Sequence, residues 1–288
     1  MNHNQRNRQL AINYAVLNKL VRDQKAINAM ITKTNIDELL NVKDFYFRYF
    51  PSSKFVEFFP QVLNLLNKET EAAFGRLKPR LRIITKYDAI YPNALLQDLQ
   101  DDAPMFIYAC GDTSLLDRKL SKLNLICTST QDDIMIHKSS HLIDGFNQTP
   151  YVMVFSQQTA LSRVLYYQIL KMQLSSLLII NHALTKSIFK NSFYPCNQAD
   201  TKHMILSAIA PGEEISQKHQ LLSSQIACSL SKVSILLSNE HQDLDLPVSL
   251  VSLKSYRPIL CPFLLHLNQE LIITVDQANL VKQIDSMI

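Results

Sequence analysis

The chain has 288 residues, of which 47% are hydrophobic and 19% charged, and its formal net charge is +4. A chain of this length and composition can bury a core for one large domain and a small one, as an ordinary soluble globular protein does. The N-terminus is polar and no apolar run reaches the ~18 residues of a membrane span, so we expect a cytoplasmic protein without a signal peptide or membrane contact.

The first 75 residues have the apolar periodicity of helices. Over residues 9–31 apolar side chains recur mostly at helical spacing without Gly or Pro, which predicts an amphipathic helix. Thr34 or Asn35 can cap a short helix that follows. A further helix is expected to end near Gly75, with Pro60 close to a boundary or a kink because proline lacks the backbone donor. These features predict a small all-helical N-terminal domain.

Basic side chains are concentrated in the N-terminal part of the chain. Residues 1–86 hold 15 Lys and Arg against 7 Asp and Glu, a net charge of +8, whereas the remaining residues carry a net charge of −4. The densest run, which we interpret as a basic linker over residues 76–86, contains Arg76, Lys78, Arg80, Arg82 and Lys86. Their alternation would set several cations on one side of an extended segment, where they could follow nucleic-acid phosphates. A solvated linker that binds nothing is the alternative.

After the linker, short apolar runs alternate with helical stretches. Nearly continuous apolar runs are typical of strands that are covered on both faces. The expected strands are residues 123–128, 151–155, 177–181, 204–208, 233–237 and 259–261. Crossover helices are expected over residues 160–172 and 217–230, and a terminal helix over residues 275–287. This alternation predicts an α/β fold with a doubly wound, mostly parallel, Rossmann-like sheet.

Residues that could support catalysis or metal binding are sparse. The five cysteines are scattered without a Cys-x-x-Cys pair, so we expect reduced core residues and neither a disulfide nor a zinc site. His137 and His141 could share a helix face, but no carboxylate ligand lies nearby in the sequence. No Gly-x-Ser-x-Gly nucleophile motif is present. We therefore expect no cofactor, no metal and no enzymatic activity.

Two blocks of residues carry a family resemblance. The first runs from Tyr91-Pro92 through Asp102-Ala103-Pro104 to Gly111, and the second from Phe193-Tyr194-Pro195 through Ser207 and Pro211-Gly212-Glu213 to Ile226-Ala227. In this order and at this spacing they resemble landmarks of the DprA/Smf family (DNA processing protein A), whose members load recombinase onto incoming single-stranded DNA. The resemblance spans about two thirds of the chain.

The resemblance implies a domain organisation and a function. It implies a SAM-like helical domain over residues 1–75, the basic linker over 76–86 and a DprA-like Rossmann domain over 87–288. The implied function is non-catalytic: binding of single-stranded DNA and loading of recombinase in natural transformation and recombination. The implied partners are single-stranded DNA, a RecA-like recombinase or another competence protein, and possibly a second copy of the chain.

The binding motifs of the family are not matched. Where the family has a Gly-Ser/Thr-Arg turn, this chain has Cys127-Thr128-Ser129, and the family's glycine-rich loop becomes residues 155–162 without a glycine. The family's histidine aligns with Tyr166, its Arg-Asn-Arg element with residues 223–225, and its Ser-Gly-Ser/Thr stretch with residues 243–245. We expect a degenerate pocket, ordinary helix N-caps at its strand-to-helix turns and negligible nucleotide binding there.

Two functions remain open. One is a divergent DNA-binding recombination mediator in which contact with single-stranded DNA has moved to the basic linker. The other is a protein-interaction module that keeps the fold as a scaffold and no longer binds nucleic acid. Binding to single-stranded DNA that weakens with salt would separate them.

Overall fold

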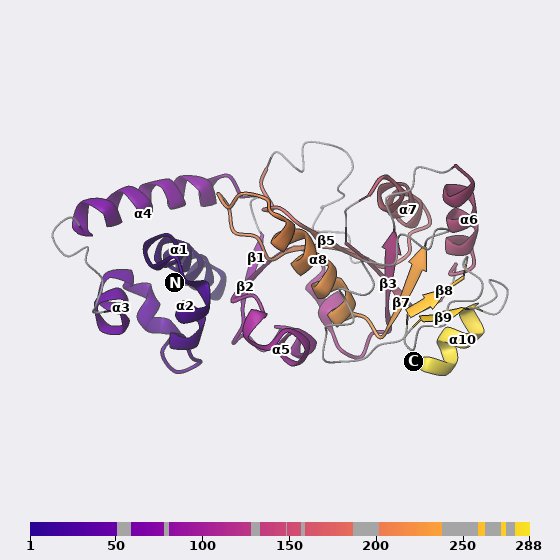
Figure 1. The fold of residues 1–288 in the computed structure, drawn as a ribbon, viewed down its shortest axis with the longest axis horizontal. Helices are drawn as coiled ribbons and strands as arrows, with labels where there is room; N and C mark the ends of the chain where they lie inside the picture. The colour runs from indigo at the N-terminus through magenta and orange to yellow at the C-terminus, as the bar shows by residue number, and fades with distance from the viewer. Residues whose placement is uncertain are drawn as a thin grey trace.

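The N-terminal part of the chain is helical. The computed structural model describes residues 1–50, 59–77, 81–127, 133–147, 149–156, 159–186, 202–237, 259–262, 272–274 and 280–288. Five helical elements come first: α1 (His3–Val21), α2 (Gln24–Met30), the 3-10 helix η1 (Ile36–Leu40), α3 (Val42–Tyr49) and α4 (Phe59–Gly75). They gather at one end of the molecule (Figure 1). None of the described helices is both long and apolar enough to cross a membrane.

The rest of the described chain builds a sheet with helices on both faces. Its strands are β1 (Arg82–Thr85), β2 (Phe106–Gly111), β3 (Lys122–Cys127), β4 (Val152–Ser156), β5 (Ser176–Ile180), β6 (His203–Ser207), β7 (Val233–Leu237), β8 (Ile259–Cys261) and β9 (Ile272–Thr274). Its helices are α5 (Asn93–Leu99), η2 (Gln100–Asp102), η3 (Thr113–Leu116), α6 (Asp133–Asp144), α7 (Ala160–Lys171), α8 (Gln217–Leu230) and α10 (Leu280–Met287).

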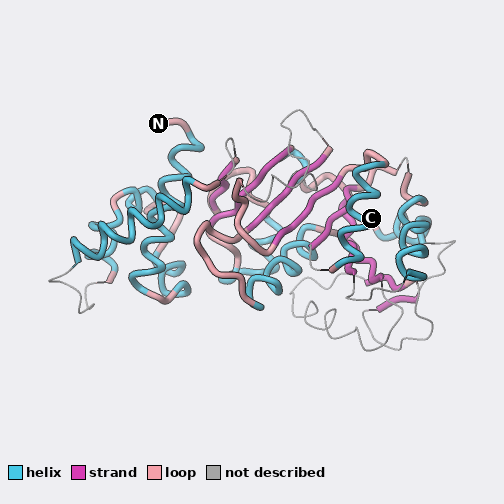
Figure 2. Tube along the Cα trace, turned by 90° about the horizontal axis from the view of Figure 1, so that it is seen from above, coloured by secondary structure: helices cyan, strands magenta, loops and turns pink. Residues whose placement is uncertain are grey.

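The strand order is β1-β2-β6-β5-β4-β3-β7-β8-β9. The strands from β6 to β9 pair in parallel, whereas β2 is antiparallel to both β1 and β6. The chain therefore proceeds from β3 outward to β6 and then returns to place β7 on the other side of β3, as in a doubly wound sheet. Figure 2 shows the strands side by side from above.

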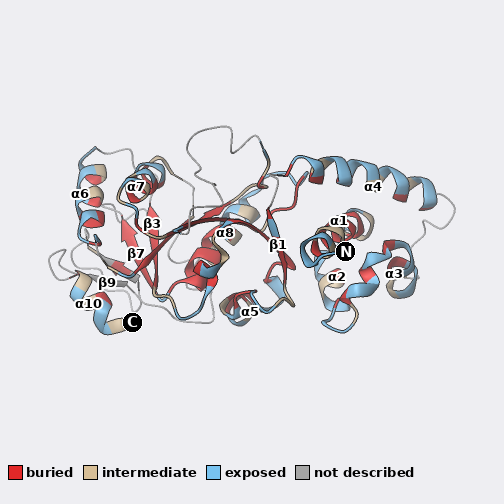
Figure 3. Cartoon of the chain, turned by 180° about the vertical axis from the view of Figure 1, so that it is seen from behind, coloured by how far each residue is buried: buried red, intermediate tan, exposed pale blue. Residues whose placement is uncertain are grey.

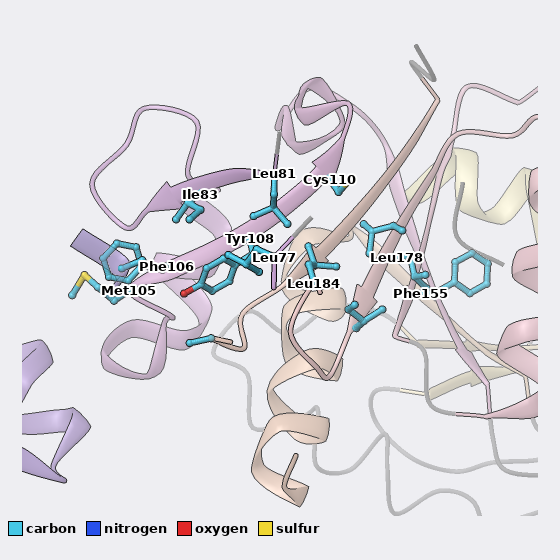
Figure 4. Packing of buried hydrophobic residues seen from close by; sticks show 14 of the residues in the cluster. Leu77, Leu81, Ile83, Met105, Phe106, Tyr108, Cys110, Phe155, Leu178 and Leu184 are labelled. Atoms are coloured by element: carbon cyan, nitrogen blue, oxygen red, sulfur yellow. The ribbon is translucent and has the colours of Figure 1, made fainter. Parts of the chain in front are cut away.

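Two apolar cores lie on the two faces of this sheet. One packs the helices α6, α7 and α10, together with the N-terminal helices, against one face. It extends from Ile83 and Tyr108 near the sheet's first edge to Leu178 and Phe155 in its centre (Figure 4). The other core packs α5 and α8 against the opposite face. The strands between them are almost wholly buried (Figure 3), which explains their continuous apolar sequences.

Polar side chains fasten the N-terminal helices to the edge strand β1. Asn4 Oδ1 accepts from the Ile83 amide at 3.0 Å, and Asn4 Nδ2 donates to the Leu81 carbonyl at 3.0 Å. Asn7 Nδ2 donates to the Ile83 carbonyl at 2.8 Å and to Asp88 at 2.7 Å. The same Asp88 oxygen accepts from the Thr85 amide at 2.8 Å. The outward-facing backbone groups of β1 are thus paired by side chains.

The α/β fold with a mostly parallel, doubly wound, Rossmann-like sheet is confirmed. Five expected strands are found within one residue at each end as β3 to β7, and the strand at residues 259–261 is found as β8. The terminal helix is confirmed over residues 280–287, while residues 275–279 lie outside the described chain. The short helix before residue 41 has Asn35 as its N-cap, and Pro60 lies in the first turn of α4.

Three sequence expectations were wrong or incomplete. The helix expected over residues 9–31 is broken, because Arg22 adopts a left-handed conformation with φ 58° and ends α1. The strands β1, β2 and β9 and the helix α3 were not predicted. The expectation that all five cysteines are reduced is wrong for Cys110, which is disulfide-bonded. Cys127 and Cys228 are free and buried, as expected.

Candidate nucleic-acid interface

The carboxyl edge of the parallel strands is where doubly wound sheets bind ligands, next to the point where the strand order reverses. Here that point lies between β3 and β7, which end at Cys127 and Leu237. Residues 128–132 and 238–258, which follow these strands, lie outside the described residues. They include Ser129 and residues 243–245, for which the sequence predicted the loss of binding motifs. The landmark Phe193-Tyr194-Pro195 also lies outside them.

The α8 positions that align with the family's arginine-containing element hold two buried serines and the half-buried Gln225. Ser223 and Ser224 are each 3% exposed. Their hydroxyls donate to carbonyls one turn earlier, Ser223 to His219 at 2.9 Å and Ser224 to Gln220 at 3.3 Å. The Ser224 hydroxyl also lies 3.5 Å from the hydroxyl of Ser156 at the end of β4. These side chains pack α8 onto the sheet and carry no charge that could neutralise a phosphate.

The turn from β4 into α7 has an ordinary helix cap. Thr159 Oγ1 accepts from the Ser162 amide at 3.1 Å, and Ser162 Oγ in turn accepts from the Thr159 amide at 3.1 Å. This reciprocal pair is a capping box, which confirms the expected N-cap. Tyr166, which aligns with the family's histidine, is 1% exposed and packs edge-on against Phe155 in the core.

The landmark residues of the family serve the fold in this chain. Tyr91 Oη donates to the Pro104 carbonyl at 2.8 Å and joins the start of the first block to its middle. Gly111 has φ +108°, and an added Cβ would lie 2.2 Å from the His203 carbonyl oxygen. Ser207 Oγ donates to the His182 carbonyl at 2.8 Å and accepts from the Ile209 amide at 3.0 Å, which ties the ends of β5 and β6 together.

Three cations gather where α4 ends and the basic linker begins. Arg8 donates to the Phe74 carbonyl at 2.8 Å, and Lys186 Nζ donates to the Gly75 carbonyl at 3.1 Å. The Lys186 amide donates to the Arg76 carbonyl at 2.8 Å, and Arg76 and Lys186 are exposed. We call Arg8, Arg76 and Lys186 the Arg76 cluster. Cations are favoured at a helix C-terminus, so these residues also stabilise α4.

The Arg76 cluster lies beside the carboxyl edge of the sheet. Leu77 forms an antiparallel bridge with Thr185, five residues beyond the end of β5. Leu77 and Leu184 are both buried in the same core, as Figure 4 shows. The start of the basic linker and the carboxyl edge of the sheet are therefore neighbours, which no pattern in the sequence could have predicted.

The other described cations of the linker do not join this cluster. Arg82 is exposed, and its guanidinium donates to Thr113 Oγ1 at 2.6 Å, toward the amino edge of the parallel strands. Lys86 is half-buried and donates to the Gln100 carbonyl at 3.2 Å. Burial lowers the pKa of Lys86, and the nearby Asp101 opposes that shift. Arg76, Arg82 and Lys86 thus do not form one stripe; the other two cations of the predicted run, Lys78 and Arg80, lie outside the described residues.

A cavity of about 240 Å³ lies between the N-terminal helices and the sheet. Tyr14 of α1, Tyr108 of β2 and Glu213 are among its lining residues, together with His219 of α8. Burial raises the pKa of Glu213 and lowers the pKa of His219, whose Nε2 lies 3.7 Å from the Glu213 carboxylate. Glu213 is itself exposed, and no spacing pattern in the sequence could have placed it opposite α1.

The two histidines of α6 do not form a metal site with the described residues. The rings of His137 and His141 lie side by side with centroids 5.4 Å apart. Within the described part of the chain, no group of three potential ligands gathers around a metal position.

Comparison with known proteins identifies the fold. No protein-family model and no curated protein matches the sequence. DNA processing protein A (DprA) from Streptococcus pneumoniae is similar in structure, with a TM-score of 0.56 and 15% identity over 96% of this chain and 90% of that one. DNA processing protein A from Helicobacter pylori, whose structure addresses a single-stranded DNA binding mode, has a TM-score of 0.51 and 18% identity over 71% of this chain and 87% of that one. The chain therefore has the fold of the DprA proteins, as its sequence landmarks predicted.

Proposed function

We propose that this chain is a non-catalytic, DprA-like DNA-processing protein that binds single-stranded DNA through basic residues beside a degenerate pocket. The proposed contact residues are the linker cations Arg76, Lys78, Arg80, Arg82 and Lys86, joined by Lys186. The observation that carries the proposal is the Arg76 cluster. It sets exposed cations next to the carboxyl edge of the sheet, and among the described residues no carboxylate forms an ion pair with any of its three members.

Two further features support this proposal. The similar protein from Helicobacter pylori binds single-stranded DNA, according to the description of its structure. The arginines of the family's Arg-Asn-Arg element align with Ser223 and Gln225, which carry no charge, so affinity must come from cations elsewhere. The proposal extends to natural transformation and recombination, in a cytoplasmic setting, with a RecA-like recombinase or another competence protein as partner and possibly as a homodimer.

The test measures how the affinity for a fluorescent oligo-dT changes with salt concentration. For single strands each neutralised phosphate contributes about 0.7 to the slope of log affinity against log salt. The double variant Arg76→Gln/Lys186→Gln should therefore lower the slope by about 1.4. The variant Arg82→Gln/Lys86→Gln should lower it less, because both side chains already bind groups of the protein.

A charge-matched control separates a local contact from a loss of net charge. Lys138 of α6 and Lys171 of α7 are exposed and lie away from the linker. The variant Lys138→Gln/Lys171→Gln should leave the slope unchanged. An equal decrease of the slope in this control would contradict the proposal, and so would a wild-type chain that does not bind oligo-dT at low salt.

The alternative is a protein-interaction module. The observation that favours it is a set of exposed apolar side chains on the paired helices α6 and α7. Val164 and Tyr167 lie one turn apart on α7 and are 42% and 63% exposed, and Ile134 of α6 is 62% exposed. A wild-type chain that fails to bind DNA but co-purifies with a recombinase would favour this alternative.

A further inference from the structure

A cavity of about 870 Å³ opens at the amino edge of the parallel strands, on the side of the sheet opposite the carboxyl edge. The loop before α5, the turn after η3, the start of β3 and the end of α8 form its walls. Small-molecule sites commonly have volumes of about 300–1,000 Å³, so this cavity is large enough for a ligand of that class. Of the sequence landmarks, Tyr91 and Pro92 line this cavity, and the Arg76 cluster lies at the other edge of the sheet.

Positive charge predominates in this cavity. Arg118, Lys122 and Lys232 line it, and Asp117 is the one carboxylate among its lining residues, all of which are described. The Asp117 carboxylate already accepts from the Lys119 amide at 2.9 Å. A fourth cation lies close by, because Arg82 donates to Thr113, which is itself a lining residue. The net charge favours an anionic ligand.

Lys122 gives the strongest indication of such a ligand. It is only 2% exposed, at the first position of β3. Its ammonium group donates to the Asp117 carbonyl, and among the described residues no carboxylate forms an ion pair with it. Burial lowers the pKa of Lys122 to about 8, Asp117 opposes this shift and Lys232 adds to it. A buried ammonium beside a second lysine is costly unless an anion compensates it.

We propose that this cavity binds a phosphorylated small molecule of mononucleotide size. The phosphate would lie against Lys122 and Lys232, because lysine binds phosphate as a compact point charge. The organic part would lie along the apolar wall, to which Ile90, Leu116 and Met287 contribute. This site is separate from the Arg76 cluster, which carries the proposed DNA contact and lies at the other edge of the sheet; of the described proposed contacts, Arg82 lies next to the cavity.

The test is calorimetry on the full chain with AMP, adenosine and inorganic phosphate as separate titrants. AMP should bind one to one with a dissociation constant below about 1 mM, and adenosine at least about tenfold more weakly. Lys122→Met and Lys232→Met should each weaken AMP binding by about tenfold or more. Lys119→Met removes an exposed charge from the same turn without touching the cavity lining, so it should bind AMP as the wild type does.

The outcomes that overturn the proposal are distinct. No AMP binding by the wild-type chain, or unchanged affinity in Lys232→Met, would overturn it; Lys232 is exposed, so this variant keeps the core intact. If inorganic phosphate bound as tightly as AMP, the proposal of a ligand of mononucleotide size would be overturned. If Ser156→Ala/Ser224→Ala, at the carboxyl edge, weakened AMP binding as much as the lysine variants do, AMP would bind at that edge and this site would be overturned. None of these results depends on whether oligo-dT binds.

Discussion

Three of the landmark residues hold backbone groups of the sheet and its loops in place. Tyr91, Gly111 and Ser207 each satisfy a demand of the backbone: a donor for a buried carbonyl, a left-handed turn and a link between two strand ends. The aligned binding positions Ser223, Ser224 and Tyr166 have become core residues. The absence of charge at these positions could be predicted from the sequence. Their burial could not, because it depends on how α7 and α8 pack on the sheet.

The Tyr91 hydroxyl should contribute measurably to stability. Tyr91→Phe leaves the buried Pro104 carbonyl without its donor, which should lower the free energy of unfolding by about 1–3 kcal/mol. Urea unfolding followed by circular dichroism measures this change. Tyr167→Phe is the control, because Tyr167 is 63% exposed and should change stability by less than ~0.5 kcal/mol. Equal changes in the free energy of unfolding for the two variants would show that the hydrogen bond from Tyr91 to the Pro104 carbonyl does not stabilise the fold.

Cys127 should be unreactive in the folded protein. Burial raises the pKa of its thiol to about 12, so the reactive thiolate is scarce at pH 8. Incubation with a thiol reagent followed by peptide mass spectrometry should find Cys127 unlabelled until denaturant is added. The buried Cys228 should behave in the same way. Rapid labelling of native Cys127 would indicate that the end of β3 opens to solvent.

Among the strands, those that are completely buried could be predicted from the sequence, whereas the edge strand β1 could not. The central strands β3 to β7 are covered on both faces, so their apolar runs mark them clearly. The edge strand β1 has four residues and begins with Arg82, inside a run that reads as a basic linker. The break between α1 and α2 was missed because Arg22 takes the left-handed conformation without the usual glycine signal.

The antiparallel pairing of β2 with β6 depends on Gly111. In Gly111→Ala the new methyl group would lie 2.2 Å from the His203 carbonyl oxygen and 2.9 Å from Met204 Cα, at a φ that L-residues rarely adopt. We expect a loss of more than ~3 kcal/mol of stability or no soluble protein. Thermal unfolding measures the loss. Gly75→Ala, where a Cβ meets no atom within 4 Å, should change stability by less than ~0.5 kcal/mol; a similar loss in both variants would contradict this account.

For the whole molecule, the N-terminal helices and the sheet should unfold as one unit. The sequence predicted a helical part and a sheet part, but no pattern showed that Asn4 and Asn7 of α1 bind the backbone of β1. This coupling joins residues 76 or more positions apart in the chain, beyond the reach of local periodicity. Asn7 is 0% exposed and has two hydrogen-bond acceptors, Ile83 O and Asp88.

Asn7→Ala should therefore destabilise both parts together. It leaves the Ile83 carbonyl without that donor, which should cost about 1–3 kcal/mol. Native-state hydrogen exchange should show protection falling equally in α1 and in β1. Asn147→Ala is the control, because Asn147 is exposed and its replacement should leave exchange unchanged. Loss of protection in α1 alone, with β1 unaffected, would show that the two parts unfold independently.

Asn4 and Asn7 of α1 form hydrogen bonds with the outward-facing backbone groups at β1, as a neighbouring strand would. This pairing has a consequence for self-assembly. A chain shortened by its first eight residues would keep most of α1 but expose the Leu81 carbonyl and both polar groups of Ile83. Such an open strand is a template for another copy of the same strand. Shortened chains should then polymerise edge to edge, at a rate that rises with concentration. Asn4 and Asn7 in the first turns of α1 therefore prevent another copy of the chain from extending the sheet at β1.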